Sequence, residues 1–94
     1  GSIPSDPKEQ IRLAFERAHA ILESVGLDFT DVVELVSYHV GLAETLSDFR
    51  AVKEEFIRSD FTAWTILGVA ELARKELIVE IKIIASTANK QQGQ

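Results

Sequence analysis

The segment Ala63–Ile84, with the sequence AWTILGVAELARKELIVEIKII, holds the residues of this chain that could do chemistry. Glu80 places one carboxylate among isoleucines, where it could act as a general base or pair across strands with Arg74 or Lys75. Trp64 contributes an indole, which could floor a pocket for an apolar or cationic ligand or lie in the core of an interface between chains. Catalytic and structural roles therefore both remain open for this segment.

The two histidines offer two further options. His39 ends a predicted strand beside Gly41 and could titrate near neutral pH in catalysis, or be structural or solvated. His19 lies four residues before Glu23 on a predicted helix and is expected at the surface. The chain has no cysteine, which excludes disulfides and thiol catalysis, and it lacks a histidine–carboxylate spacing typical of metal sites. The sequence predicts no metal and no other cofactor.

Length and composition predict one small globular domain. The 94 residues suit a single core, which we place at residues 3–86, with residues 1–2 as the scar of a removed tag and residues 87–94 as a flexible tail. Net charge is −5 and the lysines and arginines are scattered, so no nucleic-acid surface is expected. No apolar run could span a membrane and no secretory leader is evident, so a cytoplasmic location is predicted.

The first predicted element is a helix with clear signals at both ends. Asp6 can cap free amides, Pro7 fits the first helical position, and Glu9 completes a capping box. Apolar residues then recur at helical spacing as far as Val25. Gly26 suits a left-handed C-cap, after which the next residue, a leucine, folds back onto the helix.

The rest of the chain predicts a second helix and three strands. The strands are expected at Asp31–Val40, Ala63–Leu72 and Leu77–Ala85, and the helix at Thr45–Arg58. Thr45 and Asp48 could form the capping box of that helix. The order is α-β-α-β-β, an α+β fold with a right-handed parallel crossover and, in the last two strands, an antiparallel hairpin.

The last two strands are apolar on both sides, which bears on assembly. Residues 77–85 place Leu77, Val79, Ile81, Ile83 and Ala85 on one face, and Ile78, Glu80, Lys82 and Ile84 on the other. Two helices can cover only one face of such a sheet, and three strands expose on the order of 400 Å² on the other face. Hiding that area would contribute roughly 10 kcal/mol before association costs. We therefore predict an oligomer whose chains cover this face.

Three stretches of the sequence together resemble one known family. EQIRLAFERAHAILESVGLDFTDVVELVSYHV, DFRAVKEEFI and TAWTILGVAELARKELIVEIKIIAS are similar to the first helix and strand, the second helix and the closing strands of the RidA/YjgF proteins. These are reactive-intermediate imine or enamine deaminases, also described as endoribonuclease L-PSP-like. The resemblance implies a chorismate-mutase-like sheet with two helices on one face, a homotrimer, and ligand clefts between subunits.

The resemblance also implies roles for particular residues. Glu80 matches the family's pocket glutamate, which positions the attacking water, and the Ile66 backbone matches groups that contact the ligand. Trp64, followed by Thr65, stands where the deaminating members have an arginine that holds the substrate carboxylate, which indicates a divergent branch. Family members begin with about two further strands, and no residues before Ile3 can supply them.

Two functions follow from these expectations. In one, an oligomer binds a small metabolite at intersubunit clefts and acts as a hydrolase on an imine or enamine, with Glu80 activating water and residues 64–66 contacting the ligand. In the other, the protein is a non-catalytic trimeric binding or structural module whose cleft is filled by Trp64.

Overall fold

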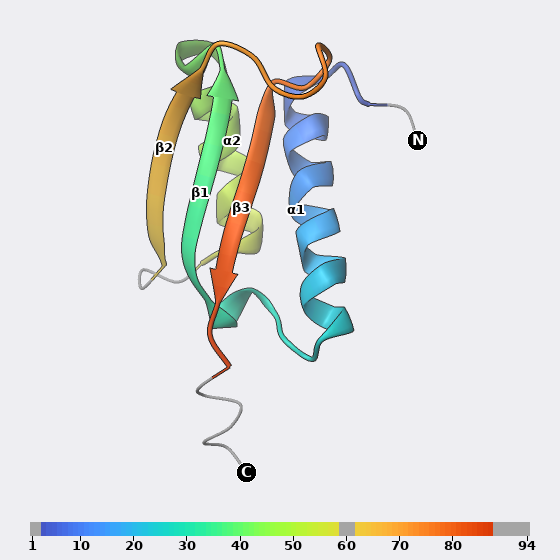
Figure 1. Cartoon of the computed structure of the whole chain (residues 1–94), viewed down its shortest axis with the longest axis vertical. Helices are drawn as coiled ribbons and strands as arrows, with labels where there is room; N and C mark the ends of the chain where they lie inside the picture. Colours follow the sequence, from blue (N-terminus) through green and yellow to red (C-terminus); the bar gives the residue numbers. More distant parts are fainter. Residues whose placement is uncertain (1–2, 59–61, 88–94) are drawn as a thin grey trace.

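Two helices packed against one face of a three-stranded sheet make up the fold (Figure 1). The computed structural model describes residues 3–58 and 62–87. The elements, in chain order, are α1 (Pro7–Ser24), the 3₁₀ turn η1 (Phe29–Asp31), β1 (Val32–Val40), α2 (Leu42–Phe56), β2 (Ala63–Val69) and β3 (Val79–Ala85). The predicted α+β class and the order α-β-α-β-β are confirmed.

Helix α1 begins and ends where its sequence signals predict. The Asp6 carboxylate accepts a hydrogen bond from the Lys8 backbone N–H at 3.2 Å. Gly26 adopts a left-handed backbone with φ of 77°, which a side chain would disfavour. The next amide, of Leu27, donates back to the Leu22 carbonyl at 2.9 Å, as in a Schellman motif. The chain therefore leaves the helix at a fixed angle and enters η1 and β1.

Strand β1 lies at the centre of the sheet, between β2 and β3. It pairs in parallel with β2, with Ser37 opposite Ile66, and antiparallel with β3, with Ser37 opposite Ile81. The crossover from β1 through α2 to β2 is right-handed, as predicted (Figure 1).

The predicted hairpin between the last two strands is wrong. Strands β2 and β3 occupy opposite edges of β1 and do not pair with each other. Strand β2 ends at Val69 and β3 begins at Val79, so the connection is much longer than a hairpin loop. This connection crosses the end of β1, where the Val40 N–H donates to the Ile78 carbonyl at 2.8 Å. The central strand β1 is therefore paired on both of its edges. A hairpin of the last two strands would have left one edge of β1 unpaired.

Helix α2 begins three residues earlier than predicted, and Thr45 is not its cap. The N-cap is Gly41, whose φ of 73° turns the chain directly from strand to helix. Thr45 lies within the first turns of the helix, and its hydroxyl contacts His39 instead of a free helix amide. The capping box expected from Thr45 and Asp48 is therefore absent from the described residues of α2.

The core fills the space between the helices and the sheet. Its largest members are aromatic: Phe15 packs on Phe29, Phe49 and Phe56 with ring centroids 5.2–6.0 Å apart. The buried side-chain amide of Gln10 forms hydrogen bonds to three backbone positions beside the start of β3. It donates to the carbonyls of Pro4 and Glu76, both at 3.0 Å, and accepts from the Ile78 N–H at 2.6 Å. This side chain fixes the point where β3 begins.

Candidate functional site

The strands present two different faces, and the candidate residues are divided between them. The helix face of the sheet consists of Leu35, Ser37, His39, Trp64, Ile66, Gly68, Val79, Ile81 and Ile83. The opposite face, which we call the open face, consists of Glu34, Val36, Tyr38, Ala63, Thr65, Leu67, Glu80, Lys82 and Ile84. The predicted assignment to the two faces is confirmed for Val79–Ala85, whereas Ile78 precedes the strand and packs against the core.

The open face brings several polar groups of different chemistry together. Glu80 lies directly across from Tyr38, so the exposed carboxylate and the phenol are cross-strand neighbours. Lys82 and Thr65 flank the central Val36 from the two sides. These groups could together accept a proton, donate a hydrogen bond and supply a cation to a bound ligand.

Tyr38 was missed by the sequence interpretation. The sequence of the segment before Gly41 predicts a strand but does not single out Tyr38 as a functional residue. The signal that could have found it is the alternation of side chains along a strand. Once Ser37 and His39 are assigned to the helix face, Tyr38 must lie on the other face.

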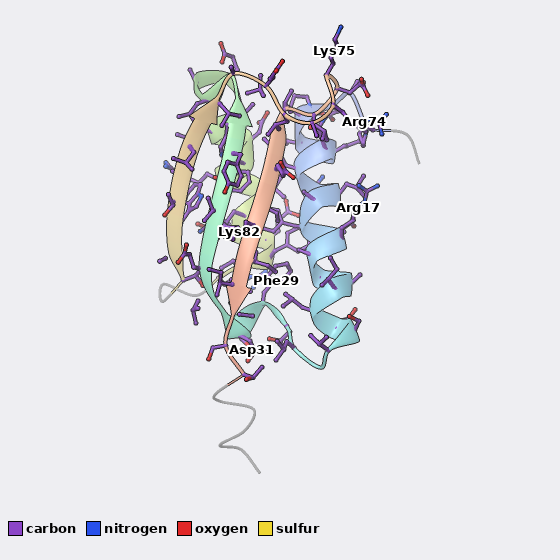
Figure 2. All side chains as sticks on the ribbon, viewed as in Figure 1. Arg17, Phe29, Asp31, Arg74, Lys75 and Lys82 are labelled. Carbon is purple, nitrogen blue, oxygen red and sulfur yellow. The ribbon has the colours of Figure 1, made fainter. Side chains whose placement is uncertain are left out.

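Glu80 does not form the cross-strand ion pair considered for it. Arg74 donates instead to Glu76, at 3.1 Å, within the connection between β2 and β3. Figure 2 shows Arg74 and Lys75 in this connection, above the end of the sheet. Among the described residues, the ion pairs are those of Arg12 with Glu55, His19 with Glu23, and Arg74 with Glu76.

Trp64 lies on the helix face and packs within its own chain. Its indole stacks on Phe49 with centroids 5.4 Å apart, and its Nε1–H donates to the Ser37 hydroxyl at 2.9 Å. Two cations of α2 lie over the same ring: Lys53 Nζ is 4.9 Å and Arg50 Cζ 5.9 Å from the centroid. The ring therefore joins the start of β2 to α2.

His39 is completely buried and belongs to a small polar network. Its Nε2 lies 2.7 Å from the Ser37 hydroxyl and its Nδ1 lies 2.8 Å from the Thr45 hydroxyl. Burial lowers the pKa of His39 below that of an exposed imidazole, because the charged form loses its solvation. Of the two roles considered, the structure supports the structural one. Ser37 and Thr45, which complete the network, were not recognised from the sequence.

One chain does not bring the predicted site residues together. Trp64 and Ile66 lie on β2 and Glu80 on β3, with β1 between them, so their backbones are about 10 Å apart or more. Trp64 and Glu80 also lie on opposite faces, whereas Thr65 shares the open face with Glu80. A single cleft that includes all four residues would have to form between chains.

The described residues hold no cluster of histidine, cysteine or acidic side chains that could bind a metal. None of their helices is long and apolar enough to cross a membrane. The surface position predicted for His19 is confirmed, and its Nδ1 lies 3.6 Å from the Glu23 carboxylate.

The fold, with its open face, defines a protein of the endoribonuclease L-PSP class. The model of the Endoribonuclease L-PSP family matches residues 1–87 of this chain. The RutC family protein YjgH of Escherichia coli K12 is 36% identical over 86 residues, which cover 90% of this chain and 64% of YjgH. The chain belongs to this family, which includes the RidA/YjgF proteins.

Solved structures of relatives have the same fold. The structure of YjgH superposes with a TM-score of 0.82 at 35% identity and covers 90% of this chain. The structure of Escherichia coli TdcF with bound serine superposes with a TM-score of 0.79 at 27% identity, over 90% of this chain and 68% of TdcF. The present chain spans only 65% of the YjgH structure.

Proposed function

We propose that the protein forms a homo-oligomer in the cytoplasm, trimeric as the family resemblance implies, and binds a small metabolite between its chains. At that site it hydrolyses an imine or enamine. The observation that carries this proposal is the open face, where Glu80 lies beside Tyr38 on the side of the sheet opposite both helices. The apolar side chains around them give a second chain something to pack against.

The chemistry of a suitable ligand follows from the polar groups on this face. Lys82 carries a positive charge two residues from Glu80 on the same strand, and Thr65 adds a hydroxyl. A small molecule with a carboxylate and a nitrogen could use both the cation and the carboxylate. The relative TdcF was solved with serine, which has these two groups. Lys82 would then supply the positive charge that Trp64 cannot provide.

The proposed reaction is the addition of water to a carbon–nitrogen double bond. Glu80 removes a proton from water as the water oxygen bonds to the imine carbon, and the imine nitrogen gains a proton from Tyr38 or solvent. Glu80 then returns its proton to the amine nitrogen of the carbinolamine, the C–N bond breaks and ammonia leaves. The hydroxyl proton passes to Tyr38 or solvent, which restores the donor, and a ketone forms. An enamine must first take a proton at carbon to become the imine. No oxidant or reductant is needed.

Ammonia release tests this proposal. An enzyme that generates 2-aminoacrylate supplies the imine, and ammonia is measured with and without the protein. Glu80→Gln keeps the size of the side chain but removes its basicity, so it should slow the accelerated release by about 100-fold or more. Glu34→Gln makes the same change on the same face, opposite Ile84, and should leave the rate unchanged. Equal activity of Glu80→Gln and the wild type would exclude Glu80 as the base.

The second candidate function is a non-catalytic binding or structural module. The packing of Trp64 on Phe49 and its hydrogen bond to Ser37 support a structural role for the indole, because these contacts commit it to the core of its own chain. They place Trp64 on the helix face, so the cleft between chains is not filled by this residue as the sequence led us to expect. An intact oligomer that does not accelerate ammonia release at all would support this candidate over the hydrolase.

A further inference from the structure

Four buried or half-buried side chains form a continuous hydrogen-bonded chain beneath α2. It runs from Trp64 at the edge of the sheet through Ser37 and His39 in the central strand to Thr45 in the helix. The three contacts are 2.9, 2.7 and 2.8 Å long, and Ser37 and His39 are 0% exposed. A central strand in a small core would ordinarily place apolar side chains at such positions.

The partners assign a direction to these hydrogen bonds. The indole can only donate, so Ser37 accepts from Trp64. The Thr45 hydroxyl can donate to the Leu42 carbonyl, 3.4 Å away, and then accepts from His39 Nδ1–H. The neutral imidazole consequently accepts at Nε2, and Ser37 donates to it. We call this hydrogen-bonded series of Trp64, Ser37, His39 and Thr45 the relay. Each polar group in the relay has a hydrogen-bond partner when His39 is neutral and carries its proton on Nδ1.

We infer that Ser37 and His39 are positioning residues that hold Trp64 against the helix layer, and that protonation of His39 releases it. Neither step depends on which ligand the protein binds. The Ser37–His39 distance is also that of a nucleophile–base pair, but neither residue is accessible to a substrate. Their effect is therefore on the position of Trp64.

Protonation leaves the relay with one donor too many. The imidazolium donates from both nitrogens, so Ser37 would accept from both His39 and Trp64. The Ser37 hydroxyl proton then has no acceptor within the relay, and a buried donor without a partner is destabilising. Trp64 is the member best able to move, because it is the second residue of an edge strand, whereas Ser37 and His39 lie in the central strand.

The groups packed against His39 are uncharged and offer no negative charge to an imidazolium. On β2 and β3 its cross-strand neighbours are Gly68 and Val79, and on α2 it contacts Thr45 and the Phe49 ring, none of which is charged.

At the other end of the cluster, two cations, Arg50 and Lys53, lie over the Trp64 ring. Glu44 is directed toward Gly41 at the start of α2. Burial alone accounts for the lowered pKa of His39.

The direction of the pH effect follows from this shift. In the unfolded chain His39 would titrate near pH 6.5, whereas in the fold it stays neutral to a lower pH. The relay is therefore fully stabilising above about pH 6.5 and is lost as the pH falls toward the pKa of the folded state.

Tryptophan fluorescence tests the inference directly, because Trp64 is the only tryptophan. As the pH falls from about 7.5 to below the His39 pKa of the unfolded chain, the wild-type emission should shift to longer wavelength because the indole becomes hydrated, while far-UV circular dichroism stays constant. His39→Gln should abolish the shift, and His19→Gln, which changes the other, exposed histidine, should retain it.

Ser37→Ala separates coupling through the relay from a general effect of acid. This variant removes the hydroxyl between Trp64 and His39 but leaves the imidazole in place. Its emission should be at longer wavelength at neutral pH and should not respond to acid. An unchanged acid response in Ser37→Ala or in His39→Gln would overturn the inference. So would loss of helical ellipticity together with the wild-type shift, since that would mean unfolding.

Discussion

The two faces of the sheet are built from alternate residues of the same three strands, yet their chemistry differs. On the helix face, every buried side-chain nitrogen and oxygen of the described residues has a hydrogen-bond partner, and aromatic rings fill the space. On the open face, Glu80 is exposed, and Leu67 and Ile84 are each more than 40% exposed. The helix face is covered by α1 and α2 of the same chain except at a hollow between α1 and β3, whereas the open face lacks a partner surface within the described residues.

Residues that are adjacent in a strand therefore do not necessarily belong to the same site. Trp64 and Thr65 are adjacent in the sequence but lie on opposite faces, so they cannot serve the same site in the same way. If Trp64 stands in place of an arginine, as the family resemblance implies, the change lies on the helix face. Glu80, Tyr38, Thr65 and Lys82 on the open face are untouched by it.

The largest expected effect is on the helix face. Phe49 is 0% exposed and its ring contacts Phe15, His39 and Trp64. Phe49→Ala should lower the free energy of unfolding by about 3–5 kcal/mol, because it leaves a cavity in the core. In the dissociated single chain, where Leu67 is 43% exposed, the truncation Leu67→Ala on the open face should cost less than about 1 kcal/mol. Urea denaturation of both variants checks the contrast, and equal losses would mean that the faces do not differ as described.

Much of the fold could be predicted from the sequence. Helix α1, with Asp6 and Gly26 at its ends, follows from local signals, and the alternation along Val79–Ala85 assigned the faces correctly. Strand order could not be predicted in this way, because it is a non-local choice. Val79–Ala85 could pair with either neighbour, and the long connection across the end of β1 decided the outcome.

The candidate site was less predictable than the fold. The position of Glu80 on the open face follows from its register, and the family resemblance selected it. Tyr38 and the relay through Ser37 depend on which residues become cross-strand or helix–strand neighbours. The cap predicted at Thr45 was wrong for a similar reason. Gly41 allows the helix to begin earlier, and the Thr45 hydroxyl has a tertiary partner in His39, neither of which is evident from the local sequence.

The two faces of the sheet should also differ in their contribution to assembly. Leu67 is 43% exposed near the middle of the open face, so Leu67→Lys would introduce a charge into the proposed interface between chains. We expect subunit affinity to fall by about tenfold or more, since an unpaired buried charge costs more than 1.4 kcal/mol. Size-exclusion chromatography with light scattering over a concentration series measures this change.

Ile21→Lys provides the control for this experiment. Ile21 is 67% exposed, but it lies on α1 on the other side of the sheet, so the same substitution should leave the oligomer intact. A wild-type protein that is monomeric at micromolar concentration would contradict the assignment of the open face as an interface.

The smallest effect concerns a contact that belongs to neither face. Arg12 on α1 donates to both carboxylate oxygens of Glu55 on α2, at 3.2 and 2.8 Å, on the exposed side of the helices. The hydrogen bond and the charge of Arg12 lower the pKa of Glu55. Arg12→Met should therefore raise the Glu55 pKa toward its ordinary value, as NMR titration of the carboxyl group can show.

Because the folded pKa of Glu55 is lowered, the pair stabilises the protein above the pKa of an exposed glutamate and is lost as the pH falls through the folded value. Solvent and salt screen such an exposed pair, so stability at neutral pH should change little. Arg17→Met removes another α1 arginine, labelled in Figure 2, which lines the hollow between α1 and β3, and should not shift the Glu55 pKa. A large loss of stability or of assembly in Arg12→Met would mean that the outer helix surface, and not only the two faces of the sheet, holds the molecule together.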